Sequence, residues 1–154
     1  MSSIIHYNSI VQIEKSNLQK GMNFRCNPNY SVFLMSTRDG SPFEDEIAAD
    51  GRVLIYEGHN VYKHHTKGDP YKVDQPRFTP KGSLTDNGKF EKVALEFKNN
   101  NREAEIVRVY EKIKDGIWSF NGIFKLVDVY EKNINNRSVF KFILLLTDDE
   151  INEL

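Results

Sequence analysis

Three acidic residues, Glu44, Asp45 and Glu46, directly follow the aromatic residue Phe43, shortly before an apolar run at residues 53–56 that ends in a tyrosine. Three successive carboxylates cannot all be buried, because an unpaired charge is costly to remove from water. Carboxylates accept hydrogen bonds from N–H groups, and aromatic rings stack on flat surfaces. The segment therefore predicts a site for a flat polar ligand, whose faces contact the rings and whose N–H groups donate to the acids.

The residues around this segment predict how it is positioned. The run at residues 53–56 is typical of a buried strand, and a glycine turn precedes it. Tyr56 would then lie at a strand end, followed by Glu57. Taken singly, Phe43 and Tyr56 are more often core residues than ligand contacts. Their acidic neighbours favour a pocket.

The charge of the chain is unevenly distributed, although the 154 residues have a net charge of only −1. Residues 37–50 hold five acids and one base, whereas residues 62–82 hold five bases and two acids. A basic segment beside an acidic one fits a surface that contacts phosphates around a pocket that accepts N–H groups. The alternative is a solvated loop whose charges serve no partner.

The other compositional features exclude several classes of protein. With 39% hydrophobic residues, the chain is an ordinary globular domain, and no apolar stretch is long enough to span a membrane. The single cysteine, Cys26, cannot form an internal disulfide or a Cys-rich metal site, which indicates a reducing compartment. There is no Gly-rich phosphate loop and no nucleophile-elbow serine. We therefore expect no cofactor, no bound metal, no membrane partner and no catalysis.

Apolar periodicity predicts mostly strands. Residues 83–99 carry apolar side chains at the i, i+3, i+4 and i+7 positions of one helix face, beginning at Phe90, and residues 9–19 predict a second amphipathic helix. Asn121 and Gly122 indicate a bulge within a strand. These elements predict an α+β domain with a strongly curved sheet or barrel and helices outside it. The expected strands are residues 31–35, 53–56, 104–112, 117–130 and 138–146.

Three segments carry a resemblance to a known family. They are Pro42-Phe43-Glu44-Asp45-Glu46-Ile47 with Gly51 and Ile55-Tyr56-Glu57-Gly58, then Asp74-Gln75-Pro76 with Leu84-Thr85-Asp86-Asn87, and finally Phe120-Asn121-Gly122-Ile123-Phe124-Lys125-Leu126-Val127. In this order they resemble motifs of the SRA (YDG) domain, which reads modified cytosine in eukaryotic chromatin proteins and bacterial modification-dependent restriction enzymes. The match covers about residues 21–149. It implies a PUA-like β-barrel for a single domain, residues 1–154.

The resemblance also implies roles for individual residues. Phe43 and Tyr56 would stack on a base flipped out of the duplex, and one acid would accept from the cytosine amino group. Glu46 aligns directly with that acid, but one extra residue before the glycine turn lets Asp45 take the role, so both are candidates. Glu57 replaces a small hydroxyl residue. It would raise a neighbouring pKa, point away from the pocket, or accept a hydrogen bond from a hydroxymethyl group.

The resemblance implies a non-catalytic reader of 5-methylcytosine or 5-hydroxymethylcytosine in double-stranded DNA. It would be the recognition part of a modification-dependent restriction system in the cytoplasm of a bacterium or archaeon, with a nuclease domain or subunit as partner. The loop at residues 59–82 would reach the DNA. The residues expected at the DNA backbone or groove are Arg25, Lys63, His64, Lys67, Lys72 and Arg77.

Two other functions are alternatives. A PUA-like RNA-binding module has a similar barrel. A small metal-dependent nuclease of the HNH type would use His59, His64 and His65 with Asn60 as ligands and bases. That spacing is compressed, however, and no second cluster supplies the remaining ligands.

Overall fold

Three consecutive strands in the C-terminal half of the chain, residues 105–114, 117–134 and 137–146, form the centre of the sheet. They are joined by two-residue turns. The computed structural model describes residues 3–37 and 45–147. Gly116 has φ 78° in the first turn, and Asn135 and Asn136 have φ 52° and 65° in the second. Left-handed residues of this kind fit tight hairpins. The strands expected at residues 104–112, 117–130 and 138–146 are therefore present, and they form an antiparallel meander with short turns.

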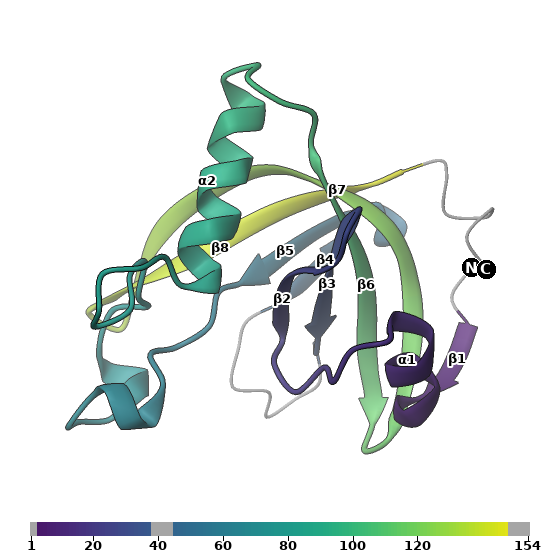
Figure 1. The fold of residues 1–154 in the computed structure, drawn as a ribbon, viewed down its shortest axis with the longest axis horizontal. Coiled ribbons are helices and arrows are strands. Elements are labelled where there is room, and N and C mark those ends of the chain that lie inside the picture. The colour runs from purple at the N-terminus through teal and green to yellow at the C-terminus, as the bar shows by residue number, and fades with distance from the viewer. Residues whose placement is uncertain (1–2, 38–44, 148–154) are drawn as a thin grey trace.

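Within the described residues, eight strands form one sheet in the order β2-β3-β6-β7-β8-β5-β4, with β1 paired to β7 (Figure 1). Only β3 and β6 run parallel, and the other neighbours are antiparallel. The α+β class is confirmed. The strands are β1 (Ser3–His6), β2 (Met22–Asn27), β3 (Tyr30–Met35), β4 (Glu46–Ala48), β5 (Val53–Glu57), β6 (Glu105–Lys114), β7 (Ile117–Ile134) and β8 (Arg137–Leu146). The helices are α1 (Tyr7–Glu14), α2 (Asp86–Lys98) and the short 3-10 helices η1 (Ala49–Gly51), η2 (Lys63–His65) and η3 (Pro70–Lys72).

Each face of the sheet has its own hydrophobic core, and each core includes residues of one helix. On one face, the ring of Phe90 in α2 packs edge-on against Phe24 and Phe33, with ring centroids 5.0 and 4.8 Å away. On the other face, Ile10 of α1 is fully buried in a cluster with Val32. Successive residues of a strand point to opposite faces, so Val32 and Phe33 enter different cores. The sheet is therefore buried on both sides at β3.

Helix α2 begins later than the sequence indicates. The Thr85 hydroxyl accepts from the Gly88 N–H (3.2 Å), which makes Thr85 the N-cap and Asp86 the first helical residue. The prediction of a helix over residues 83–99 is therefore right in the middle and wrong at the start. Three of the four predicted apolar face residues are buried, whereas Phe97 is only half-buried. None of the helices in the described ranges is long and apolar enough to cross a membrane.

The long strands β7 and β8 bend strongly, but the sheet does not close within the described residues (Figure 1). Its edge strands β2 and β4 are not paired with each other. The two ends of the sheet approach at another point, where the Tyr56 hydroxyl of β5 donates to the Leu34 carbonyl of β3 (3.1 Å). A closed barrel is therefore not confirmed. The predicted bulge is present, because Asn121 is an extra residue between the paired Phe120 and Gly122.

Candidate functional site

Tyr56 lies inside the curved sheet and is only 6% exposed. Its ring stacks on Phe33, with centroids 4.3 Å apart and planes at 29°. Burial raises the pKa of the Tyr56 phenol well above its usual value, so the hydroxyl stays a donor. A Cβ on Gly21 would lie 2.3 Å from this hydroxyl oxygen, so the contact requires a residue without a side chain. Phe33 covers one face of the ring, and Tyr56 belongs to the hydrophobic core on this side of the sheet.

Phe43, predicted as the second ring of the pocket, lies outside the described residues, as does Glu44. The position of Phe43 opposite Tyr56 therefore stays a prediction.

The register between β4 and β5 separates the two candidate acids. Glu46 pairs with Ile55, so the preceding residue, Asp45, lies opposite Tyr56. Directly opposed residues of antiparallel strands point to the same face of a sheet. Asp45 therefore shares the face of Tyr56, whereas Glu46 lies on the other face and is exposed. Of the two acids, Asp45 is therefore the one that shares a face of the sheet with Tyr56.

The Asp45 carboxylate links the end of β5 to the end of β3, although these two strands are not adjacent in the sheet. Its Oδ1 accepts from the Glu57 N–H at the end of β5 (2.9 Å), and its Oδ2 accepts from the Ser36 N–H just after β3 (3.2 Å). Burial raises the pKa of Asp45 to about 7; the two N–H donors oppose this rise, and the Glu57 carboxylate adds to it. A carboxyl that titrates near neutrality at the mouth of a strand is a candidate functional group.

This shifted pKa predicts a pH dependence of stability. The folded-state pKa of Asp45 lies above its ordinary value of 3.8, so between the two values the folded state binds the proton more tightly. The stability contributed by Asp45 is fully present below pH 3.8 and is lost as pH rises through about 7. We expect Asp45→Asn to remove this contribution when free energies of unfolding are measured in urea between about pH 5 and about pH 8.

The exposed neighbour provides the control for this experiment. Glu46→Gln should keep the pH dependence of the wild-type chain. If Asp45→Asn and the wild-type chain change in parallel over this pH range, Asp45 does not titrate as described.

Glu57 points to the face opposite Tyr56. It pairs in register with Lys141, and both residues are almost fully buried. Its carboxylate lies 3.4 Å from the Lys141 Nζ, 3.3 Å from the Gln75 Nε2 and 3.8 Å from the Arg137 Nη2. The hypothesis that Glu57 lines the pocket therefore loses its geometric basis. Of the alternatives considered for this residue, pointing away from the pocket matches the arrangement.

Two buried amides hold the start of the long loop that follows β5, and both come from the second motif of the sequence. The Asn87 Oδ1 accepts from the His59 N–H (3.0 Å), and the Asn87 Nδ2 donates to the His59 carbonyl (2.9 Å). The Gln75 Nε2 donates to the Gly58 carbonyl (2.7 Å). A Cβ on Gly58 would lie 2.4 Å from the Asn87 Oδ1. The motif therefore fixes the direction in which the loop leaves the sheet.

Four of the predicted DNA-contacting residues are exposed on this loop. Within residues 3–37 and 45–147, the three lysines among them form no ion pair, so their charges are available to a ligand. The four residues are Lys63, His64, Lys67 and Lys72.

The two predicted arginines have partners within the chain. Arg25 forms two hydrogen bonds to Glu105, both 2.7 Å long. Arg77 forms two to Glu91, of 2.5 and 3.0 Å, and an ion pair with Glu131 at 3.2 Å. Hydrogen bonding to these carboxylates raises the pKa of each guanidinium. Arg25 and Arg77 are therefore weaker candidates for phosphate contacts than the lysines.

The histidines of the loop are arranged as a stack of rings. His59 and His64 each stack on Tyr62, with centroids 5.4 and 5.9 Å away and planes within 11° and 5°. The His59 Nδ1 lies 2.8 Å from the Asn60 carbonyl and must therefore carry a proton, while burial lowers the pKa of this ring. In the described part of the chain, no group of three or more His, Cys, Asp and Glu could hold a metal ion. The geometry gives no support to the nuclease alternative.

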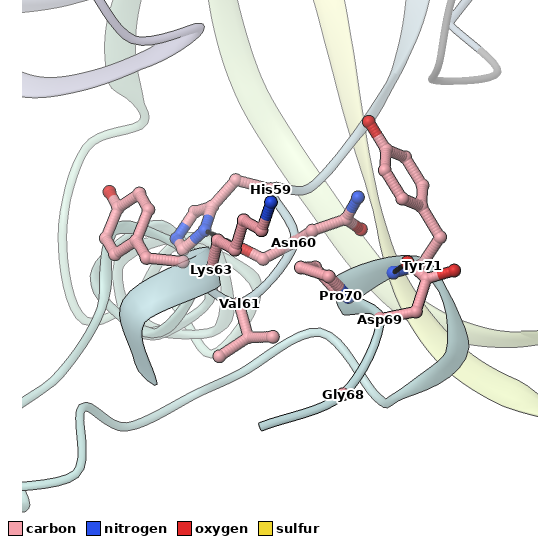
Figure 2. A pocket seen from close by; sticks show the side chains of 9 residues that line it. His59, Asn60, Val61, Lys63, Gly68, Asp69, Pro70 and Tyr71 are labelled. Atoms are coloured by element: carbon pink, nitrogen blue, oxygen red, sulfur yellow. Dashed lines mark hydrogen bonds between the residues drawn. The ribbon is translucent and has the colours of Figure 1, made fainter. Parts of the chain in front are cut away.

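Two hollows flank Tyr62. The larger, about 600 Å³, lies within the loop, and Figure 2 shows it between His59 and Lys63 on one side and Pro70 and Tyr71 on the other. The smaller, about 190 Å³, is lined by His59, Tyr62 and residues on either side of Gly21. Since Gly21 touches the Tyr56 hydroxyl, the smaller hollow adjoins the Tyr56 side of the sheet.

No family model matches the sequence, and no curated protein matches it. The fold, in contrast, is similar to solved SRA domains. The SUVH5 SRA domain in complex with fully methylated CG DNA has a TM-score of 0.65 at 18% identity, over 97% of this chain and 90% of that one. The same domain bound to fully hydroxymethylated CG DNA has a TM-score of 0.64 at 17% identity, over the same shares of both chains.

A similar fold also occurs in the modification-dependent TagI restriction endonuclease. The TM-score is 0.59 at 19% identity, over 99% of this chain and 51% of that one. The present chain thus corresponds to about half of that enzyme. Together, these similarities confirm the SRA-like fold that the sequence motifs imply.

Proposed function

We propose that the chain is a non-catalytic domain that recognises 5-methylcytosine or 5-hydroxymethylcytosine in double-stranded DNA. One observation supports the proposal: in an SRA-like fold, the β4–β5 register, continued by one residue beyond Glu46 and Ile55, brings Asp45 opposite Tyr56. The similar SUVH5 domains are bound to methylated and hydroxymethylated DNA, which supports the same ligand class here.

In this proposal, the modified base leaves the duplex and stacks on the side of Tyr56 turned away from Phe33, with Phe43 as the second wall. The Asp45 carboxylate accepts from the exocyclic amino group. Flipping a base costs a few kcal/mol, and stacking returns roughly 1–3 kcal/mol. Because this balance is small, the loop lysines must supply much of the affinity through phosphate contacts.

The finer architecture and the cellular context belong to the same proposal. Asp45 and Tyr56 both join β5 to the β3 region across the opening of the sheet, which supports a strongly curved barrel over a single domain, residues 1–154. The similarity to half of a restriction endonuclease supports a role as the recognition part of a modification-dependent restriction system, with a nuclease domain or subunit. Such a system would act in the cytoplasm of a bacterium or archaeon.

A binding panel tests the function. Otherwise identical duplexes carry cytosine, 5-methylcytosine or 5-hydroxymethylcytosine at one position, and a structured RNA of equal length is included. We expect at least one modified duplex to bind about tenfold more tightly than the plain duplex, which corresponds to ~1.4 kcal/mol. Equal affinity for all duplexes, or preference for the RNA, would refute the proposal.

The phosphate contacts give a separate prediction. Changing Lys63, Lys67 and Lys72 together to glutamine should weaken binding to modified and plain duplexes alike, because phosphate contacts carry no sequence information. The slope of log affinity against log salt should become shallower by roughly 2–3, since each phosphate that a lysine neutralises contributes about 0.9 to it.

A matched triple variant controls for net charge. It replaces the exposed lysines Lys92, Lys114 and Lys132, which lie outside the loop. This variant should retain most of the affinity. If both triple variants flatten the slope equally, the loop has no special role in binding phosphates.

A further inference from the structure

Two tyrosines, Tyr62 and Tyr71, are among the residues that line the larger hollow in the loop. Tyr62 stacks on His59 and His64. Tyr71, which is 53% exposed, stands on the side opposite His59 (Figure 2). Val61 and Pro70 add apolar surface, and the exposed Lys63 stands at the edge. A volume of about 600 Å³ lies within the usual range of small-molecule sites, which combine apolar walls with a few polar groups.

One buried guanidinium holds both sides of this hollow. The Arg137 Nη1 donates to the Asn60 Oδ1 (2.7 Å) on one side and to the carbonyls of Pro70 and Val73 (both 3.2 Å) on the other. The Asp69 carboxylate caps η3 by accepting from the Tyr71 N–H (2.9 Å). These hydrogen bonds therefore fix the positions of the residues on both sides of the hollow.

The same contacts define the polar chemistry offered to a ligand. Because the Asn60 Oδ1 accepts from Arg137, the NH₂ group of this amide is the part left to donate. An exposed aromatic face, an amide donor and an ammonium group match the three parts of a nucleotide: the flat base, its acceptor edge and the phosphate. The excess of bases over acids in residues 62–82 also favours an anionic chain.

We propose that this hollow is a second nucleotide site, separate from Tyr56, which takes an unpaired deoxynucleotide of any sequence. The base stacks on Tyr71, its edge accepts from Asn60, and the neighbouring phosphate contacts Lys63. The site lies outside the Asp45–Tyr56 region and needs no modified cytosine. It can therefore be tested independently of the function proposed above.

The probe is a short single-stranded oligothymidylate, which contains no cytosine. In a titration of the isotope-labelled full chain followed by NMR, we expect the largest shifts at the Val61 methyl groups and at the Tyr71 amide. Tyr71→Ala should weaken binding about fivefold or more, the effect of losing one stacked base. Tyr71→Phe should retain the affinity, because the ring and not the hydroxyl makes the contact.

Phe78 provides the matched control. It is 55% exposed on the same loop and does not line the hollow, so Phe78→Ala should bind the probe as the wild-type chain does. Unaltered affinity in Tyr71→Ala, or equal losses in both alanine variants, would overturn the proposal. Shifts centred on Tyr56 and Asp45 would also overturn it, since the strand would then enter the first pocket. A preference for modified duplexes could persist in each of these cases.

Discussion

Asp45→Ala is expected to bind modified and plain cytosine with nearly equal affinity, whereas Glu46→Ala should keep the preference of the wild-type chain. Asp45 lies on the face of Tyr56 and is half-buried, so a hydrogen bond from a base to its carboxylate is partly shielded from water. Losing such a bond costs roughly 1–3 kcal/mol, which is about fivefold to more than a hundredfold in affinity. Glu46 lies on the other face and is exposed.

The measurement is fluorescence anisotropy with the modified and plain duplexes, at several salt concentrations. Because Asp45 also links Ser36 to Glu57, each variant is first shown to be folded by circular dichroism. The salt-dependent background binding should be the same in both variants. If Glu46→Ala loses the preference and Asp45→Ala does not, the acceptor is Glu46 and not Asp45.

The regular parts of the fold could be predicted because their apolar residues repeat locally. Helix α2 and the strands β6 to β8 each carry enough periodic positions for this. Strand β4 could not be found, since its three residues are all exposed at the edge of the sheet and show no alternation. In β2, Arg25 has φ 50° and the register shifts nearby, which breaks the two-residue pattern. Long-range pairing, and not local preference, forms these two strands.

The same distinction applies to the candidate site. Residue types alone pointed to the acidic segment and to Tyr56, but the face on which each side chain lies depends on register. A shift of one residue reverses the face, which is why the sequence alone cannot separate Asp45 from Glu46 or decide whether Glu57 faces the pocket. Arg137 left no signal in the sequence, because its partners Asn60 and Pro70 are distant along the chain.

Helix α1 shows a further limit of local pattern. The sequence predicts a helix over residues 9–19 with Ile13 on its buried face, but α1 ends at Glu14, where Lys15 has φ 53°. Ile13 is exposed, and the carboxylate of Glu14 is fully buried. Its Oε2 accepts from the Arg108 Nε (2.8 Å) and the Tyr110 hydroxyl (2.5 Å). The apolar pattern of the helix does not predict this burial, because the charge of Glu14 is stabilised by partners in the sheet.

More groups complete this cluster on the α1 face of the sheet. The Glu14 Oε1 accepts from the Tyr30 hydroxyl (2.6 Å) and the Asn27 Nδ2 (3.1 Å). The Arg108 guanidinium also lies over the Phe120 ring, 4.7 Å from its centroid. One carboxylate thus connects α1 to β2, β3 and β6. It neutralises a cation that is itself almost fully buried.

Glu14→Ala is therefore expected to lower the free energy of unfolding by about 3–5 kcal/mol, the usual effect of leaving one charge of a buried pair without its partner. Replacing both charges, as in Glu14→Leu with Arg108→Met, should cost less than the sum of the two single replacements, because no charge then remains buried, although the Tyr30 and Tyr110 hydroxyls lose their acceptor. Urea unfolding of Glu14→Leu, Arg108→Met and the double variant measures the coupling. Ile13→Ala, at an exposed position of the same helix, is the control and should change stability by less than about 1 kcal/mol. Additive losses in the double variant would show that the pair does not act as a unit.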